Sequence, residues 1–222
     1  MALTRRPPGR LAVGRAWLDV PFADKDRVRA LGGQWDPAAR RWYAPQPHMP
    51  AFARWAELSQ TLPSEDRGFG AGLFVDLIPS TSWFTNVRAA VSPGDWERLR
   101  RMVYRRAGDC CEACGSHPDH PAGLYMEAHE RFAYDTRAGV QVLRRLICLC
   151  TACHATTHFG FTSLAGEKEA EAALGHLQFV TGMTRAQAER HVREAFALWE
   201  HRSTIAWRVD LSTIAAAGIA VR

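Results

Sequence analysis

The spacing of hydrophobic and polar positions predicts a small mixed unit in the N-terminal part of the chain. Apolar side chains at positions 17, 20 and 22 favour a short strand, and residues 23–31 favour a short helix that ends at two glycines. Aromatic residues on both sides of an Asp36-Pro37 turn predict a hairpin. Residues 49–62 predict a short amphipathic helix, so this part of the chain combines strands with helices.

Longer periodic segments predict the elements of the remaining chain. Residues 82–91 favour an extended segment, and apolar residues at helical spacing favour a helix from Pro93 to position 106. Two more helices are predicted over residues 167–180 and from Thr184 to His201, and the second opens with a Thr-x-x-Gln capping box. Alternating apolar positions between 205 and 211 favour a final strand. The mixture predicts the α+β fold class.

Changes in composition divide the chain into four segments. We expect a small α+β domain over residues 1–62, a linker over 63–75, a central domain over 76–165 and a helical region with a terminal strand over 166–222. No stretch is apolar enough to span a bilayer, and the basic start of the sequence lacks the apolar core of a secretory signal. We therefore expect a cytoplasmic protein with reduced thiols and no membrane partner.

Positive charge is concentrated in two parts of the chain. Residues 1–62 carry ten Arg or Lys against five Asp or Glu, and residues 88–108 carry six against two. Nearly all of these cations are arginines, which bind phosphate with two parallel hydrogen bonds, so the distribution favours DNA as a partner. The alternative is that the arginines only solvate the surface. The candidate nucleic-acid-binding residues are Arg40, Arg41, Arg101, Arg105, Arg144 and Arg145.

The six cysteines lie together in the middle of the chain, and four of them form two Cys-x-x-Cys pairs. Cys111 with Cys114 and Cys150 with Cys153 have the spacing of two metal-binding turns, and zinc takes four tetrahedral thiolates from two such turns. In a reducing compartment this clustering favours a structural zinc site over disulfides. The surplus thiols are predicted to be buried, although one of them is an alternative to Cys111 as a ligand; they are Cys110 and Cys148.

The segment Cys150-x-x-Cys153-His154 also matches the pattern to which a c-type haem is attached. Haem attachment requires an oxidising compartment, a second axial ligand and two cysteines that are free to form thioether bonds. Here the cysteine pair has zinc-binding partners, and no export signal is recognisable. We therefore favour zinc over haem and expect no small-molecule cofactor.

Three stretches around the cysteines resemble the HNH, or ββα-metal, endonucleases that carry two zinc-binding Cys-x-x-Cys pairs. They are CCEACG at 110–115, MEAHERFAYD at 126–135 and LRRLICLCTACHATTH at 143–158, within a resemblance that covers about residues 90–165. The resemblance implies a β-hairpin packed on a helix, a divalent cation for which we expect Mg²⁺ or Mn²⁺, and hydrolysis of DNA phosphodiester bonds. It implies that His129 is the general base, that His154 and His158 bind the cation, and that Glu130 is an accessory catalytic residue.

The residues themselves support this assignment in part. His154 and His158 are four positions apart, so a helix presents both imidazoles on one face, and a histidine titrates near the pH at which a general base acts. Ala128 stands where many members of the family carry an acidic residue or a second histidine, and Arg145 stands near the position of the family's asparagine. These departures favour an alternative, a catalytically silent module that binds DNA or protein. We predict a metal-dependent endonuclease with a structural zinc.

The stretch WLDVPFADKDRVRALGGQWDPAARRWYAP at 17–45 resembles a small domain of unknown function that accompanies plasmid primases and conjugation proteins; the resemblance covers about residues 15–48. It implies nucleic-acid handling without a defined activity. We predict that the tryptophans form the core of this domain and that the two arginines at its hairpin tip contact phosphate. The helices after residue 166 have the pattern of a cover over the central domain, but we favour the simpler interpretation that they enlarge a small core. The sequence leaves open whether the chain forms a homodimer. No site is predicted at His176 or His191.

Overall fold

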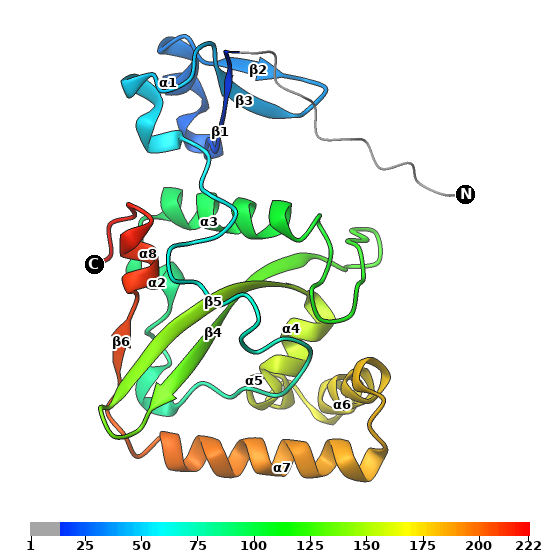
Figure 1. The fold of residues 1–222 in the computed structure, drawn as a ribbon. Coiled ribbons are helices and arrows are strands. Elements are labelled where there is room, and N and C mark those ends of the chain that lie inside the picture. Colours follow the sequence, from blue (N-terminus) through cyan, green and yellow to red (C-terminus); the bar gives the residue numbers. More distant parts are fainter. Residues whose placement is uncertain (1–13) are drawn as a thin grey trace. The chain divides into compact units, whose positions relative to one another are not determined.

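The computed structural model describes residues 14–222, and Figure 1 shows them as a ribbon. The chain divides into two compact units. Of the described residues, the smaller unit contains those up to Ser59 together with Pro93–Met102, and the larger contains Gln60–Ser92 together with Val103–Arg222. The first thirteen residues of the domain predicted over 1–62 lie outside the described part of the chain. The described chain contains both helices and strands, so the predicted α+β class is confirmed.

The small unit is a three-stranded antiparallel sheet with short helices. Strands β1 (Ala16–Leu18), β2 (Gln34–Asp36) and β3 (Arg41–Ala44) pair in the order β1-β3-β2. The 3₁₀ helix η1 (Phe22–Asp24) and helix α1 (Lys25–Ala30) follow β1, and the 3₁₀ helix η2 (Pro50–Trp55) follows β3. The predicted strand, helix and hairpin are therefore present, whereas the helix predicted over 49–62 is limited to η2.

Apolar side chains of β1, α1, β3 and η2, together with Val20 between β1 and η1, form the core of the small unit. Gly33 is required between α1 and β2, because a Cβ at this position would lie 2.4 Å from Cγ1 of Val28. Helix α3 (Pro93–Arg106) begins in this unit, where Arg101 donates a 2.9 Å hydrogen bond to the carbonyl oxygen of Val20. The buried core residues are Leu18, Val20, Val28, Trp42, Ala44, Phe52 and Trp55.

A long β-hairpin forms the centre of the larger unit. Strands β4 (Met126–Asp135) and β5 (Val140–Cys150) pair antiparallel, and β6 (Arg208–Asp210) joins β5 in parallel. The register pairs His129 with Ile147 and shifts after Arg131, where Arg144 has no partner in β4. Such a bulge bends the hairpin. Because side chains alternate along a strand, positions 127, 129 and 131 face one side of the sheet and Glu130 faces the other.

Four helices lie between the hairpin and strand β6 in the sequence. Helix α4 (Thr151–Thr157) continues directly from β5 and is followed by α5 (Phe159–Ser163), α6 (Glu167–Thr181) and α7 (Arg185–Arg202). Figure 1 shows α4, α5 and α6 gathered at one end of the hairpin, with α7 running beneath them. Helices α6 and α7 lie where the sequence predicts them, and the capping box of Thr184 and Gln187 is formed. The short elements are η3 (Ser80–Ser82), α2 (Val87–Ala90) and α8 (Ser212–Ala216).

The segment predicted to be a linker is packed into the larger unit. Leu73 and Val75 belong to the same buried cluster as residues of β5, α4 and α6. Glu65 and Arg106 form an ion pair of 2.7 Å in which both side chains are fully buried. Residues 63–75 are therefore part of the larger unit, as are the C-terminal helices that share its core. The extended segment predicted over 82–91 contains the one-turn helix α2 instead.

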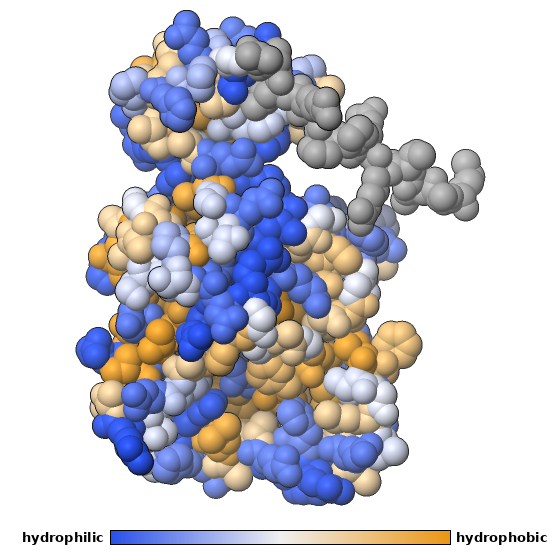
Figure 2. All heavy atoms as spheres, viewed as in Figure 1, coloured by the Kyte–Doolittle hydropathy of each residue, from blue (hydrophilic) through white to orange (hydrophobic). Residues whose placement is uncertain are grey.

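The surface of the chain is mixed in character. Figure 2 shows hydrophilic and hydrophobic residues side by side on the visible face of both units. Within residues 14–222 no helix combines the length and the apolar character that crossing a membrane requires.

Candidate metal centres

Four cysteine sulfurs converge where the β5 strand passes into α4. The sulfur atoms of Cys111, Cys114, Cys150 and Cys153 all lie within 4.8 Å of one another. The first pair lies in the loop after α3, and the second pair spans the start of α4, where Cys150 is the N-cap and its Sγ accepts a 3.5 Å hydrogen bond from the backbone of Cys153. Gly115 follows the first pair with a φ of 77°, which favours glycine. The four thiols could hold a metal such as zinc, which the sequence predicts.

The sulfurs of this cluster influence one another's protonation. Hydrogen bonds from Cys150 and Cys153 lower the pKa of Cys111, so that its thiolate is stabilised. The same contacts with Cys111 raise the pKa of Cys150 to about 11 and raise that of Cys153 as well. One negative charge is therefore accommodated and further ones are opposed. A divalent cation would remove this opposition, because all four sulfurs bind it as thiolates.

The surplus cysteines lie outside this cluster. Cys148 is fully buried, and burial raises the pKa of its thiol to about 12. Cys110 donates a 3.0 Å hydrogen bond to the carbonyl oxygen of Gly115. The convergent sulfur is that of Cys111 and not that of Cys110, so Cys111 is the fourth member of the candidate site.

Two histidines for which the sequence predicts no site have specific partners. His176, on α6, places its Nε2 atom 3.1 Å from Sγ of Cys153. His191, on α7, accepts a 3.0 Å hydrogen bond at Nε2 from the backbone of Val75. Their spacing from the cysteines contains no signal, because both contacts depend on how α6 and α7 pack. His176 therefore belongs to the surroundings of the cysteine cluster, as a hydrogen-bond partner of a ligand sulfur.

Three histidines form a second cluster beside the first. His129 lies on β4, His154 on α4, and His158 at the C-cap of α4. Ring centroids are 5.3 Å apart for His129 and His154, 4.8 Å for His129 and His158, and 4.6 Å for His154 and His158. One nitrogen from each ring lies within 4.8 Å of the other two. The structure thus brings together the three histidines that the sequence nominates.

The surroundings of these rings distinguish them from ordinary core histidines. His129 is 4% exposed, and neither of its ring nitrogens has a hydrogen-bond partner. A buried imidazole normally satisfies its nitrogens, so two orphaned atoms point to a missing partner. Glu127 approaches His154, with 3.1 Å between its Oε2 and the Nδ1 atom of the ring. Such a carboxylate fixes the tautomer in which Nε2 is free to bind a metal ion.

Burial keeps the three imidazoles in the neutral form. It lowers the pKa of His129 well below its usual value, lowers that of His158 to about 3, and lowers that of His154. The positive charge of Arg131 acts on all three rings in the same direction. Neutral imidazoles present a free lone pair, and three of them form a donor set typical of zinc and its transition-metal neighbours. The cluster contains no carboxylate ligand, so the predicted Mg²⁺ or Mn²⁺, which favour oxygen ligands, is not supported.

Glu130 lies apart from the histidines, on the opposite face of the sheet. Its Oε1 atom accepts a 3.0 Å hydrogen bond from the backbone of Val87 at the start of α2, and burial raises its pKa. Glu130 is therefore not close enough to the histidine cluster for the accessory role that the resemblance implies. Glu127 is the acidic residue on the correct face. The two-residue alternation of the strand was the signal that could have identified it, because Glu127 and His129 share a face.

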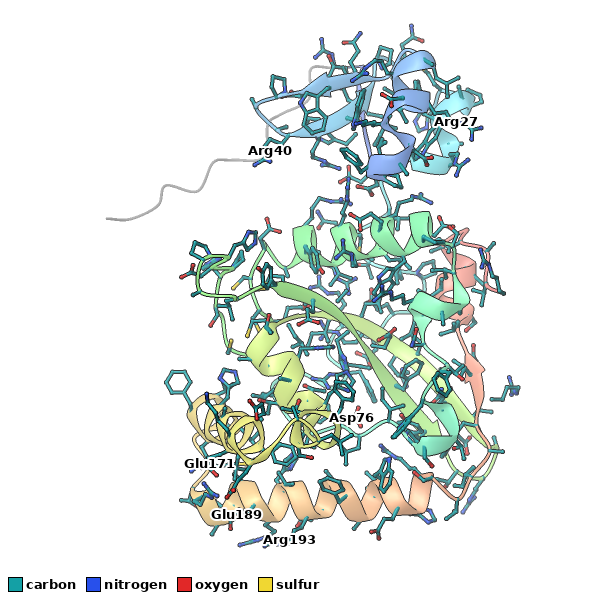
Figure 3. The ribbon with its side chains drawn as sticks, turned by 180° about the vertical axis from the view of Figure 1, so that it is seen from behind. Arg27, Arg40, Asp76, Glu171, Glu189 and Arg193 are labelled. Carbon is teal, nitrogen blue, oxygen red and sulfur yellow. The ribbon has the colours of Figure 1, made fainter. Side chains whose placement is uncertain are left out.

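A buried arginine adjoins the histidine cluster. The Arg131 side chain is fully buried and stacks on Phe74, with 4.1 Å between its guanidinium carbon and the ring centroid. One nitrogen donates a 3.4 Å hydrogen bond to Gly72, while Nε and Nη1 have no partner. Burial lowers the pKa of Arg131 to about 10, and the charge of Asp76, labelled in Figure 3, opposes this shift. Asp76 itself pairs with Arg202 of α7 at 3.3 Å. The sequence pattern did not nominate Arg131.

Most of the predicted nucleic-acid-binding arginines are engaged within the protein. Arg41 pairs with Glu57 at 3.1 Å, and Arg144 with Asp66 at 3.1 Å. Arg101 pairs with Glu97 at 2.9 Å, while Arg105 is half-buried and has partners of its own. Arg40 is exposed at the β2–β3 turn.

Arg145 lies in the interior of the protein, where it stabilises the fold, instead of on the surface, where it could bind DNA. It is almost fully buried, and its Nη2 atom lies 2.6 Å from Oε1 of Glu112. Glu112 stands between Cys111 and Cys114 and also accepts a 2.8 Å hydrogen bond from the backbone of Cys148. The pair therefore ties the first cysteine turn to strand β5. Arg145 is not available to DNA in this conformation, because its guanidinium is committed to this contact.

Comparisons with known proteins concern the small unit. Residues 15–57 match the family described as "Domain of unknown function (DUF5710)". Two proteins of Escherichia coli named "DNA primase TraC" match over 54 residues, at 50% and 37% identity. These matches cover 24% of this chain and only 5% and 4% of the two primases. No solved structure is a significant match to the chain.

The family match confirms the small domain of unknown function that the sequence pattern identifies. It extends past the predicted limit at residue 48 and takes in η2, which supplies the buried Phe52 and Trp55. The domain therefore needs η2 to complete its core. The match ends before the two metal centres, so their function rests on their own geometry.

Proposed function

We propose that the larger unit is an HNH-type, metal-dependent endonuclease that hydrolyses DNA phosphodiester bonds, and that the cysteine cluster holds a structural zinc. The observation that carries the proposal is the convergence of three neutral histidines at the junction of a β-hairpin and a helix, with both nitrogens of His129 buried and unpartnered. The cysteine pair at the start of α4 supports it further. This pair sets where the helix begins and hence where His154 and His158 project.

The residues of the histidine cluster suit a transition-metal ion. His129, His154 and His158 would hold it, and we assign His129 as the third ligand because a metal would satisfy one of its orphaned nitrogens. This differs from the general-base role that the resemblance implies. When bound, such an ion would supply Lewis acidity toward a phosphoryl oxygen and would acidify water, both of which phosphodiester hydrolysis requires.

Other side chains prepare this site for an anionic substrate. Glu127 orients His154 by contacting the Nδ1 atom of its ring. These two residues form the more exposed end of the cluster, because 38% of the Glu127 side chain and 27% of the His154 side chain are accessible. Arg131 adds a fixed positive charge near the rings, because its charge acts on all three of them. The three neutral histidines contribute no negative charge to offset a cation. A phosphate group would therefore be attracted to the site.

The experiment is a cleavage assay on supercoiled plasmid with the full chain carrying one zinc. Zn²⁺, Co²⁺, Ni²⁺, Mn²⁺ and Mg²⁺ are compared, and nicked and linear products are quantified. We expect the imidazole-preferring ions to support cleavage and Mg²⁺ to support little. His158→Ala should abolish cleavage, whereas His201→Ala, a change at an exposed histidine on α7, should leave it intact.

Two outcomes would change the proposal. Cleavage by His158→Ala at the wild-type rate would locate the activity elsewhere. If no ion supports cleavage while the protein still binds DNA, the chain is a silent DNA-binding module. The metal content of His129→Ala separates the two roles of this residue. If His129 is a metal ligand, the variant loses the second ion, and if it is only the general base, the variant retains that ion.

A further inference from the structure

The most exposed tryptophan of the small unit lies outside the core that the sequence predicts for it. Trp42 and Trp55 are buried, but 48% of Trp35 is exposed. Trp35 sits on strand β2 opposite Trp42, and the two rings meet edge to face with 5.7 Å between their centroids. The contact holds the Trp35 indole in place while leaving much of its surface open. An aromatic ring that is both fixed and exposed is a platform on which another flat group can stack.

Two arginines lie near this platform. The guanidinium carbon of Arg29 is 5.8 Å from the Trp42 ring centroid, and 68% of the Arg29 side chain is exposed, although one of its nitrogens contacts the exposed Asp26. Arg40 lies in the turn that joins β2 to β3, and Figure 3 shows it at the end of the hairpin. Among residues 14–222 the structure gives the Arg40 side chain no hydrogen-bond or ion-pair partner. Its charge is available to a ligand.

The backbone at Arg40 is unusual for an arginine. Its φ is 52°, in the left-handed region that favours glycine or asparagine. The turn does not depend on the Arg40 side chain, because Asp36 holds it by accepting hydrogen bonds from the backbones of Ala38 and Ala39, each at 2.9 Å. Arg40 is costly for the backbone, and its side chain has no hydrogen-bond or ion-pair partner in the described part of the chain, which suggests a role toward a ligand.

We infer that Trp35, Arg29 and Arg40, here called the Trp35 surface, bind single-stranded nucleic acid. One base stacks on the indole of Trp35, and the two arginines contact the flanking phosphates. A base in a duplex has both faces covered by its neighbours, so a stacking platform selects single strands. Residues 15–57 carry seven Arg or Lys against five Asp or Glu, which favours a polyanion. The relatives that match this segment are named as DNA primases.

This site belongs to the small unit and does not depend on the histidine cluster. The first experiment is photocrosslinking of the full chain, carrying one zinc and no added divalent ion, to a short oligothymidylate that contains 5-iodouracil. Mass spectrometry then locates the crosslinked peptide. We expect the crosslink in the peptide that contains Trp35. Crosslinks confined to residues 60–222 would overturn the proposal.

Fluorescence anisotropy with a labelled oligothymidylate then measures the contribution of each residue. Trp35→Ala should weaken binding about fivefold to a hundredfold, the range that stacking of one base provides. Trp83→Ala is the matched control, since 55% of this tryptophan is exposed in the larger unit, and it should bind like the wild type. If Trp35→Ala and Trp83→Ala bind equally well, the platform is not used.

Arg40→Gly keeps the test informative even if Trp35→Ala unfolds the small unit. Glycine adopts the left-handed backbone without strain, so this variant should melt no lower than the wild type. Its binding should nevertheless weaken, and the slope of log K against log salt should fall by about 0.7, the loss of one phosphate contact on a single strand. An unchanged slope with intact affinity would contradict the role of Arg40.

Discussion

Glu127 provides the sharpest test of how the histidine cluster binds metal. The change to alanine removes the carboxylate that lies 3.1 Å from Nδ1 of His154. The imidazole then loses the partner that fixes its tautomer and orientation, which typically costs ten- to a hundredfold in metal affinity. Both side chains are partly exposed, so water can replace part of the contact. We therefore expect the lower limit of that range, about tenfold or ~1.4 kcal/mol.

The assay is a titration of Co²⁺ into protein that already carries one zinc per chain. The absorption of the cobalt ion reports occupancy of the histidine cluster, while zinc keeps the cysteine cluster occupied. Glu127→Gln should give an intermediate affinity, because its amide oxygen still accepts from the ring N–H. His154→Ala marks the effect of losing the ligand itself.

Glu130→Gln is the control, because this neighbouring carboxylate faces α2 instead of the histidines. It should leave cobalt affinity unchanged. The reasoning would be refuted if Glu127→Ala bound Co²⁺ like the wild type, or if Glu130→Gln weakened binding more than Glu127→Ala. The second result would restore the accessory role that the sequence resemblance implies for Glu130.

Three further predictions concern other buried contacts of the larger unit. His176→Ala should speed the release of zinc to a chromophoric chelator, because Cys153 loses the 3.1 Å contact from the imidazole, whereas His201→Ala should not. Arg106→Leu should cost about 3–5 kcal/mol of unfolding free energy in a urea titration, because it leaves Glu65 buried and unpaired; replacing both by leucine should cost less. Burial raises the pKa of the Tyr134 hydroxyl above 10.0, because the folded protein disfavours the phenolate. The stability that the neutral side chain contributes is therefore complete below pH 10.0 and is lost as the pH rises toward the folded-state pKa. In absorbance titration at high pH, Tyr134→Phe should remove the last of four tyrosine transitions, and an unchanged final transition would contradict this.

Local patterns predicted most of the fold. The capping box of Thr184 located the start of α7, and Pro93 located the start of α3, because these signals act within one turn of helix. The linker prediction for residues 63–75 was wrong. Its polar and glycine-rich composition is typical of a flexible connection, but Leu73, Val75 and the Glu65–Arg106 pair bury it. Only long-range packing decides whether such a segment is free.

The two metal centres show the same division between local and long-range information. The spacing of cysteines predicted the four-sulfur cluster, because each Cys-x-x-Cys turn is a local unit. The helical spacing of His154 and His158 predicted a shared face. By contrast, the contact of His176 with Cys153 joins residues on different helices, and Arg145 is buried against Glu112, which lies far from it in the sequence. The resemblance to a family suggested Glu130, whereas the structure places Glu130 against α2 and Glu127 beside His154.

Cys153 and His154 are adjacent residues of the short helix α4, so the position of the cysteine cluster determines the direction in which the helix histidines project. The cysteine cluster fixes the rotation of the helix about its axis, and each residue added to a helix turns the later residues by about 100°. One residue inserted between Cys153 and His154 would therefore rotate both helix histidines away from His129 without removing any ligand. The same insertion in the β4–β5 turn, at positions 136–139, would leave the two clusters in their present orientation relative to each other. Tolerance to insertions along this chain should thus drop sharply within the seven residues of α4.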